Sequence, residues 1–291
     1  MRKLLFLLLA ALPFCGHAQR KLNLTFFGGF SNYSGDLQSK RFTMDESKGA
    51  VGAGLRYELT SRFAVHGNLL YAKVSGDDKK NELTLRHRNL HFESRIFEGN
   101  LLADYALMDP SEHQIWPYVF AGVALYHFNP YTFDTLTGSK VFLKPLSTEG
   151  QGLPQYPDRK PYKLYQIGIP FGAGFRIRIT DNAILGYEIG MRKLFTDYLD
   201  DVSRTYVDGA TLLAERGQRA VDYAYRGDEL KDGDPNYPVN TAVRGGAKYK
   251  DWYYFSGITL SIGISDLEGG KLKLFNKKNN NGSVDCPKGV L

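Results

Sequence analysis

The chain has 291 residues, of which 43% are hydrophobic, 13% aromatic and 23% charged. A mean hydropathy of −0.34 and 31 glycines argue against a bundle of membrane helices, and 19 tyrosines with 18 phenylalanines argue against disorder. The net charge of +6 falls to +4 when Arg2 and Lys3 are removed with a leader segment, because 35 basic residues then face 31 acidic ones. This balance is too mild to predict a nucleic-acid partner.

Residues 1–18 are typical of a secretory signal peptide. Arg2 and Lys3 precede an apolar run at residues 4–14, and small residues lead to a cleavage position after Ala18. The run is about half of the roughly 20 residues that a membrane-spanning helix needs, so a retained anchor is the weaker interpretation. We therefore expect an exported chain.

The cysteines limit the chemistry of the exported chain. Lipidation of Cys15 is disfavoured, because the bulky Phe14 stands where lipoproteins carry a small residue. Cleavage after residue 18 removes Cys15 and leaves Cys286 as the only thiol. An internal disulfide and a cysteine metal site are then excluded.

Side chains in the body of the chain, residues 19–265, alternate with period two. Residues 49–59 place Val51, Ala53 and Leu55 on one face and glycines with Arg56 and Glu58 on the other. This pattern indicates a strand with one apolar face. It recurs at four further segments, which are residues 63–72, 167–179, 185–192 and 252–264.

The polar face distinguishes a membrane barrel from a soluble sandwich. In a sandwich this face meets water and glycine weakens the strand, whereas here it is dense in glycine with isolated charges. That composition is typical of the cramped lumen of a small closed barrel. The charges expected to face this lumen and to pair there are Arg56, Glu58, Glu93, Arg176, Arg178, Glu188 and Arg192.

The predicted fold class is all-β, an eight-stranded antiparallel transmembrane β-barrel. The fourth strand carries apolar residues in two phases, with Phe92 and Ile96 in one and Leu101 and Tyr105 in the other, which predicts a bulge at residues 96–98. The eight strands are expected at residues 24–34, 49–59, 62–75, 89–106, 114–128, 164–179, 183–194 and 251–264.

The connections between these strands alternate between long and short. Outer-membrane barrels have long extracellular loops, short periplasmic turns and an even strand count that leaves both termini in the periplasm. Eight strands leave a lumen that side chains fill, so we expect no wide pore. The long connections are residues 35–48, 76–88, 129–163 and 195–250, and the short ones are residues 60–61, 107–113 and 180–182.

Four segments together resemble a family of Bacteroidota outer-membrane β-barrels that includes PorG, a component of the type IX secretion system. They are FGG at residues 27–29 with SNYSGDL at 31–37, PYVFAGV at 117–123, LSTEGQG at 146–152 and FTDYLDDVS at 195–203. The resemblance implies a non-enzymatic subunit, embedded in outer-membrane lipid, that docks a periplasmic ring formed by a lipoprotein and its partner. It implies no catalysis, and no cofactor is expected.

The tail at residues 266–291 is the candidate contact for such a partner. It carries five lysines against three acidic residues, and Cys286 could pair with a partner's thiol in an oxidising compartment. The alternative is that the tail is a solvated extension of the chain with no binding role. The candidate contact residues are Lys271, Lys273, Lys277, Lys278 and Cys286.

Two acidic groups in the last long connection are candidate cation sites. Clustered carboxylates suit calcium, or a divalent bridge to lipopolysaccharide, but their spacing does not match an EF-hand loop. Solvated loops are the favoured interpretation and no metal is assigned. The residues are Asp197, Asp200 and Asp201 in one group, and Asp228, Glu229, Asp232 and Asp234 in the other.

His87 and His91 lie four residues apart at the outer end of the fourth strand. A metal or phosphate site would need a third ligand, and none is nearby in sequence, so a polar rim is the favoured interpretation. None of the histidines lies in a nucleophile motif, and the chain is predicted not to be an enzyme.

Three functions follow from these patterns, in order of preference. The first is a structural subunit that docks secretion components in the periplasm. The second is a surface barrel whose loops at residues 129–163 and 195–250 bind an extracellular ligand or shield the envelope. The third is a lipid-modifying enzyme at the outer rim, which would depend on His87 and His91.

Overall fold

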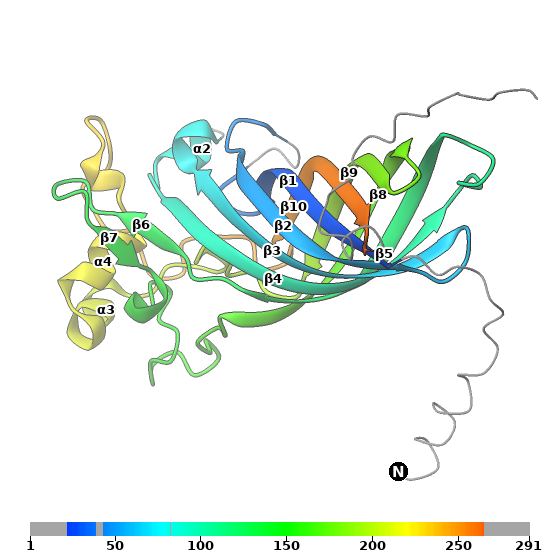
Figure 1. The fold of residues 1–291 in the computed structure, drawn as a ribbon. Coiled ribbons are helices and arrows are strands. Elements are labelled where there is room, and N and C mark those ends of the chain that lie inside the picture. Colours follow the sequence, from blue (N-terminus) through cyan, green and yellow to red (C-terminus); the bar gives the residue numbers. More distant parts are fainter. Residues whose placement is uncertain (1–21, 39–42, 82, 265–291) are drawn as a thin grey trace, which may run out of the picture.

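The computed structural model describes residues 22–38, 43–81 and 83–264. Eight long strands pair antiparallel with their neighbours, and β1 pairs with β10, which closes the sheet into a barrel (Figure 1). The predicted fold class is therefore confirmed. The strands are β1 (Leu22–Ser34), β2 (Lys48–Glu58), β3 (Phe63–Asp77), β4 (His91–Ala106), β5 (Ile115–His127), β8 (Tyr165–Thr180), β9 (Ala183–Leu194) and β10 (Trp252–Gly263).

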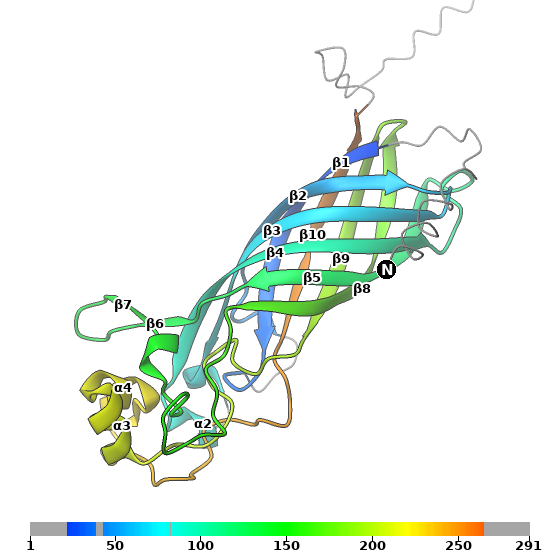
Figure 2. The ribbon, with the colours of Figure 1, turned by 90° about the horizontal axis from the view of Figure 1, so that it is seen from below.

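The long connections gather at one end of the barrel, where they carry all the other regular elements that the structure describes (Figure 2). Among the residues that the structure describes, no helix is long and apolar enough to cross a bilayer. The elements are η1 (Asp78–Lys80), α2 (Leu83–Arg86), β6 (Tyr131–Phe133), β7 (Lys140–Phe142), η2 (Lys144–Leu146), α3 (Gly209–Arg216), α4 (Gln218–Ala224) and η3 (Gly227–Glu229).

Local sequence sets where these elements begin and end. Asp208 caps α3 by accepting a hydrogen bond from the Thr211 backbone N–H at 2.8 Å. Gly217 ends the helix with φ +81°, a conformation that favours glycine.

Strands β6 and β7 form a hairpin that extends the sheet beyond β4 (Figure 2), and Leu136 at its tip is 96% exposed.

The outward face of the barrel is apolar, as the alternation predicts. Leu69 is 74% exposed, Leu101 67% and Val123 58%, all on the exterior of neighbouring strands. Water-soluble monomers rarely expose apolar surface on this scale, and in a bilayer the same surface is covered by acyl chains.

The inward face is crowded by backbone and rings. A Cβ added to Gly122 would lie 2.0 Å from the Leu101 carbonyl oxygen, and one added to Gly172 would lie 2.1 Å from that of Ile189. Larger residues therefore do not fit at these positions. The glycines on the polar face therefore allow strands and side chains to pack closely inside the barrel.

The bulge predicted in the fourth strand is wrong. The β3–β4 register runs without a break from Phe63 opposite Tyr105 to Asp77 opposite His91. Phe92 and Ile96 point into the barrel, whereas Leu101 and Tyr105 point outward, so the two apolar phases are two faces of one regular strand. The inner face is apolar at this end because it belongs to a plug.

The plug is a cluster of buried apolar side chains that fills the barrel at its long-loop end. The rings of Tyr126 and Tyr253 lie 5.6 Å apart edge to face, and those of Tyr33 and Phe92 lie 4.8 Å apart in the same manner. Edge-to-face pairs are favourable beyond the area they bury. The plug also includes Leu199 and Val202 of the last long loop, so the loops and the barrel share one hydrophobic core.

Candidate functional site in the lumen and the loop cap

Below the plug, one buried carboxylate organises the charges near the short-turn end of the lumen. Asp104 on β4 accepts hydrogen bonds from Arg56 Nε at 3.2 Å, from Arg176 Nη2 at 2.8 Å and from the His66 ring. Arg56 also donates to Glu58 at 2.6 Å. Strands β2, β3, β4 and β8 are thus tied together through one acidic residue.

A second group of charges lies nearer to the long-loop end of the lumen, next to the plug. Arg192 Nε lies 3.2 Å from Glu98 Oε2, and the Tyr253 hydroxyl donates to the same carboxylate at 2.6 Å. Glu188 accepts from the Tyr118 hydroxyl at 2.8 Å. Most of these side chains are almost fully buried, so their charges and polar groups are compensated within the barrel.

The structure places most of the predicted lumen charges inside the barrel. Arg56, Arg176, Glu188 and Arg192 are in the two groups just described, with Glu58 at the short-turn rim. Arg178 also lies at this end, where it donates to the Pro110 carbonyl at 2.5 Å and its guanidinium lies 5.6 Å from the Trp116 ring.

The prediction that Glu93 faces the lumen is wrong. Glu93 shares the outward phase of β4, where it binds Lys73 at 2.6 Å and the Tyr131 hydroxyl at 2.8 Å, so it does not face the lumen. A bulge at residues 96–98 would turn Glu93 inward, whereas the regular strand turns it outward. The same alternation places Glu98 and Asp104 inside, and these are the acidic partners that the sequence analysis missed.

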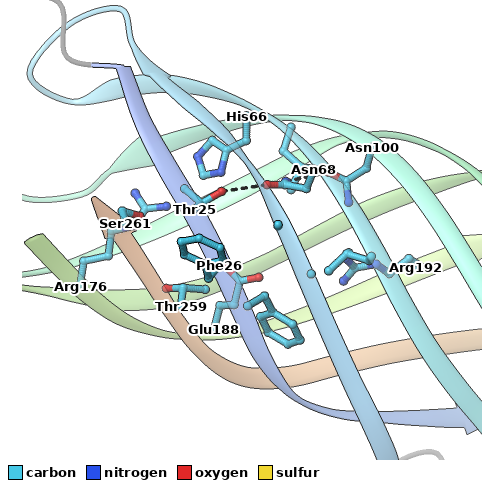
Figure 3. Close-up of a pocket in the computed structure, with 15 residues that line it drawn as sticks. Thr25, Phe26, His66, Asn68, Asn100, Arg176, Glu188, Arg192, Thr259 and Ser261 are labelled. Carbon is cyan, nitrogen blue, oxygen red and sulfur yellow. Dashed lines mark hydrogen bonds between the residues drawn. The ribbon is translucent and has the colours of Figure 1, made fainter. Parts of the chain in front are cut away.

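A small polar cavity remains between the two charge groups (Figure 3). Its volume is about 40 Å³, which is room for roughly two or three water molecules. Thr25 donates to Asn68 across it at 3.4 Å (Figure 3). The cavity is too small for a substrate, and the plug closes the lumen above it. Its polar lining includes Thr25, His66, Asn68, Arg176, Glu188 and Arg192.

Above the barrel, the long loops form a folded unit that we call the loop cap, residues 35–38, 43–47, 78–81, 83–90, 128–164 and 195–251. Glu149 is fully buried in it and accepts hydrogen bonds from the backbone N–H groups of Ser203 at 2.9 Å and Arg204 at 3.1 Å. Arg244 Nη1 lies 3.0 Å from the same carboxylate. One acidic side chain therefore joins two long loops.

Three of the four family-like segments meet in this cap. Thr148 donates to Asp201 at 2.5 Å, which links residues 146–152 with 195–203. Tyr33, within residues 31–37, donates to Asp200. These segments are distant in the sequence, and the loop cap gives all three a shared structural role.

The acidic group at residues 197–201 is buried, so the expectation of a solvated loop is wrong. Asp197, Asp200 and Asp201 are at most 3% exposed. Asp197 accepts from the Ser203 hydroxyl at 2.8 Å, and Asp200 accepts from the Val202 N–H at 2.9 Å. These hydrogen bonds replace part of the water that the carboxylates lose on burial.

Two further carboxylates accompany them in the cap. Asp251 accepts from the Leu199 N–H at 2.8 Å, and Asp36 accepts from the Gly246 N–H at 2.9 Å. Among the described residues, no group of three or more His, Cys, Asp or Glu side chains is arranged to hold a metal ion.

Burial changes the proton affinity of these acids. It raises the pKa of Asp197 to about 7. The pKa of Asp201 rises to about 6, where burial outweighs the nearby Arg244 guanidinium. Burial, together with the charges of neighbouring carboxylates, holds the pKa values of Asp200 and Asp251 well above their ordinary range.

The remaining predicted groups are not brought into a site. His87 is exposed, and His91 Nδ1 lies 3.0 Å from the Thr132 hydroxyl with its ring stacked on Phe133. Asp228, Glu229, Asp232 and Asp234 lie toward solvent in the cap. The predicted signal peptide and the tail with Lys271, Lys273, Lys277, Lys278 and Cys286 lie outside the described residues.

A closed barrel with an apolar exterior and a polar, filled interior is a transmembrane β-barrel. A family model described as a domain of unknown function, DUF6089, matches residues 2–140. No protein of curated function matches the chain.

Several solved barrels are similar in fold. Neisserial surface protein A is 9% identical, with a TM-score of 0.41, over 84% of this chain and 99% of that one. Ail of Yersinia pestis, in complex with the heparin analogue sucrose octasulfate, is 7% identical with a TM-score of 0.40 over the same shares. A major outer membrane protein from Thermus thermophilus is 11% identical with a TM-score of 0.40, again over the same shares. At these scores the similarities say nothing about function.

Proposed function

We propose that this protein is a non-enzymatic barrel of a Gram-negative outer membrane, exported by cleavage of its signal peptide, and a docking subunit of type IX protein secretion. The observation that carries the proposal is the filled lumen. Two charge groups and an aromatic plug occupy it, so neither a solute path nor a substrate pocket is available there. A barrel of this kind acts through the surfaces at its two ends.

The periplasmic end is the proposed docking surface for ring proteins. The turns at this end are short, so we expect the tail at residues 266–291, more than the turns, to carry the partner contact. Its lysines give it a positive balance that suits an acidic partner surface. The secretion role itself rests on the four family-like segments.

A crosslinking pull-down from intact envelopes tests this proposal. Full-length protein is compared with a chain truncated after Ser265 and with a variant in which Lys271, Lys273, Lys277 and Lys278 are all alanine. We expect the full-length protein to recover periplasmic ring components and the truncated chain to lose them. A Cys286→Ser variant is the matched control for disulfide capture. Failure of the full-length protein to recover any ring component would overturn the secretion role.

A second function is favoured by the loop cap. It is folded, and it displays apolar side chains to solvent, with Val239 78% and Val243 76% exposed. A surface barrel that binds an extracellular ligand or stabilises the envelope would use this end. In that case ligand capture on intact cells would survive the tail truncation. A rim enzyme is the weakest alternative, and it predicts that His87→Ala with His91→Ala abolishes lipid modification.

A further inference from the structure

A groove lies on the outside of the barrel at the long-loop end. It has a volume of about 670 Å³ and runs from the outer faces of β8, β9 and β10 to the loop that follows β1. Its wall on the strands is made by Phe171, Met191, Trp252 and Tyr254, with Tyr249 and Lys250 at its upper edge.

Strand register explains why these apolar side chains form a continuous wall. Tyr254 lies opposite Met191, and Met191 lies opposite Phe171, so one row crosses three strands on the outward face. The rings of Phe171 and Trp252 pack edge to face, 6.0 Å apart. This row is continuous with the apolar exterior, so the molecules that cover the barrel in a membrane also reach the groove.

Two lysines stand beside the apolar wall. Lys250 lines the groove, donates to the Ala247 carbonyl at 3.2 Å and acts with its charge on the buried Asp197, and an ammonium group has three donors in all. Lys193 is exposed and lies directly opposite Trp252 in the strand register. Both ammonium groups are thus available to an anion at the level where aromatic side chains mark the membrane surface.

One acidic residue, Asp36, also lines the groove. Both of its carboxylate oxygens accept from the Gly246 N–H, at 2.9 and 3.0 Å, and the charges of Arg88 and Arg244 act on it. The carboxylate is therefore engaged by the cap, and the charge presented to a ligand at the groove is that of the lysines.

We propose that this groove is a binding site for a phosphorylated acyl lipid of the leaflet at the long-loop end. An acyl chain lies on the row formed by Phe171, Met191 and Trp252, and the phosphate lies at Lys193 and Lys250. The site depends on the membrane location of the barrel, and it is independent of the secretion role. An apolar wall beneath a cationic edge fits a lipid phosphate better than it fits a neutral lipid.

Lipid selectivity at the groove can be measured by fluorescence, because the chain has two tryptophans in different surroundings. Trp252 lines the groove, whereas Trp116 is 1% exposed and faces the barrel interior. Full-length protein in phosphatidylcholine vesicles is titrated with dibrominated phosphatidic acid or dibrominated phosphatidylcholine. Bromine quenches only a nearby indole, so Trp252 reports the occupant of the groove and Trp116 supplies an unquenched background.

We expect phosphatidic acid to be preferred over phosphatidylcholine at Trp252 by about three- to tenfold, the effect of two lysines near a membrane surface. The Lys193→Ala/Lys250→Ala variant should lose this preference. The matched control is Lys160→Ala/Lys231→Ala, which removes two exposed lysines from the cap, and it should keep the preference.

Equal quenching by the two lipids, or an unchanged preference in the groove variant, would overturn the proposal. Protection of Trp252 from both lipids would also overturn it and would assign the groove to a second copy of the barrel. Heat-dependent gel mobility shows whether each variant is folded. The pull-down of ring components does not involve the groove, so either proposal can fail alone.

Discussion

The lumen and the loop cap are both rich in buried charge, but they compensate it differently. In the lumen two buried carboxylates face cations, Asp104 with Arg56 and Arg176, and Glu98 with Arg192. In the cap, Asp197 and Asp200 are held by hydroxyl and backbone N–H groups. The lumen is held by ion pairs between strands, whereas the cap combines ion pairs, such as Glu149 with Arg244 and Asp78 with Arg88, with carboxylates that accept from hydroxyl and backbone N–H groups.

This difference predicts different responses to substitution and pH. An ion pair inside the barrel holds the strands themselves, so its loss affects the whole fold. Carboxylates held by neutral donors keep raised pKa values, so their contribution depends on protonation. The following experiments separate the two regions.

The largest effect is expected for Asp104→Ala, which leaves Arg56, Arg176 and His66 without their shared carboxylate. Uncompensated buried charge should lower the free energy of unfolding by about 3–5 kcal/mol. Urea titration in lipid vesicles, followed by tryptophan fluorescence, measures this loss. The control is Glu112→Ala at a short turn. Equal stability of the two variants would show that the lumen network does not hold the barrel.

A smaller and local effect is expected for Glu149→Gln. The amide keeps one acceptor oxygen but loses the charge that faces Arg244 and the N–H groups of Ser203 and Arg204. Opening of the cap should become easier by about 1.5–3 kcal/mol. Hydrogen exchange should rise in residues 146–162 and 195–250 and stay unchanged in the strands. Glu215→Gln, exposed on α3, is the control, and faster exchange in the strands would contradict the separation of the regions.

Over a single pH unit, the effect of pH on the stability of the cap should be smaller still. Asp197 has a pKa of about 7 in the folded protein, against an ordinary value of 3.8, so the folded cap binds the proton more tightly than the open loop does. Cap stability should therefore fall as pH rises from about 4 to 7, by less than about tenfold in the opening equilibrium per pH unit. Hydrogen exchange between pH 5 and 8, corrected for intrinsic rates, measures this slope.

Asp197→Asn should flatten that slope, whereas Asp228→Asn, which removes an exposed carboxyl, should leave it unchanged. A slope that persists in Asp197→Asn would assign the titration to Asp200, Asp201 or Asp251 instead.

The smallest signal is expected in conductance. The plug and the two charge groups fill the lumen, so purified protein in planar bilayers should pass little current. Large, stable single-channel currents would contradict the filled lumen. The Glu149→Gln variant should behave like the unaltered protein, because the plug lies below the residue that it changes.

The strands could be predicted from the sequence because their alternation is a local property. Leu69 and Leu101 face outward and Arg176 and Arg192 inward wherever the period of two continues. The same rule failed in β4, where Phe92 and Ile96 are apolar on the inner face because they belong to the plug. A plug contains residues from several strands and loops, and no local pattern reveals it.

The cap could not be predicted for a related reason. Asp201 meets Thr148 and Tyr162, and Asp200 meets Tyr33, across large separations in the sequence. An acidic loop without those partners is expected to stay in water. The family-like segments marked the right residues, although spacing alone gave no sign that they meet.

The β6–β7 hairpin has a practical consequence for cell-surface detection. Its tip projects from the sheet, and Leu136 there is almost fully exposed, so a short epitope inserted after Leu136 should reach an antibody without disturbing the buried core of the cap. The same insertion between Asp200 and Asp201 would separate residues that are buried against other loops. A tagged protein that labels intact cells would also reveal which end of the barrel faces outward.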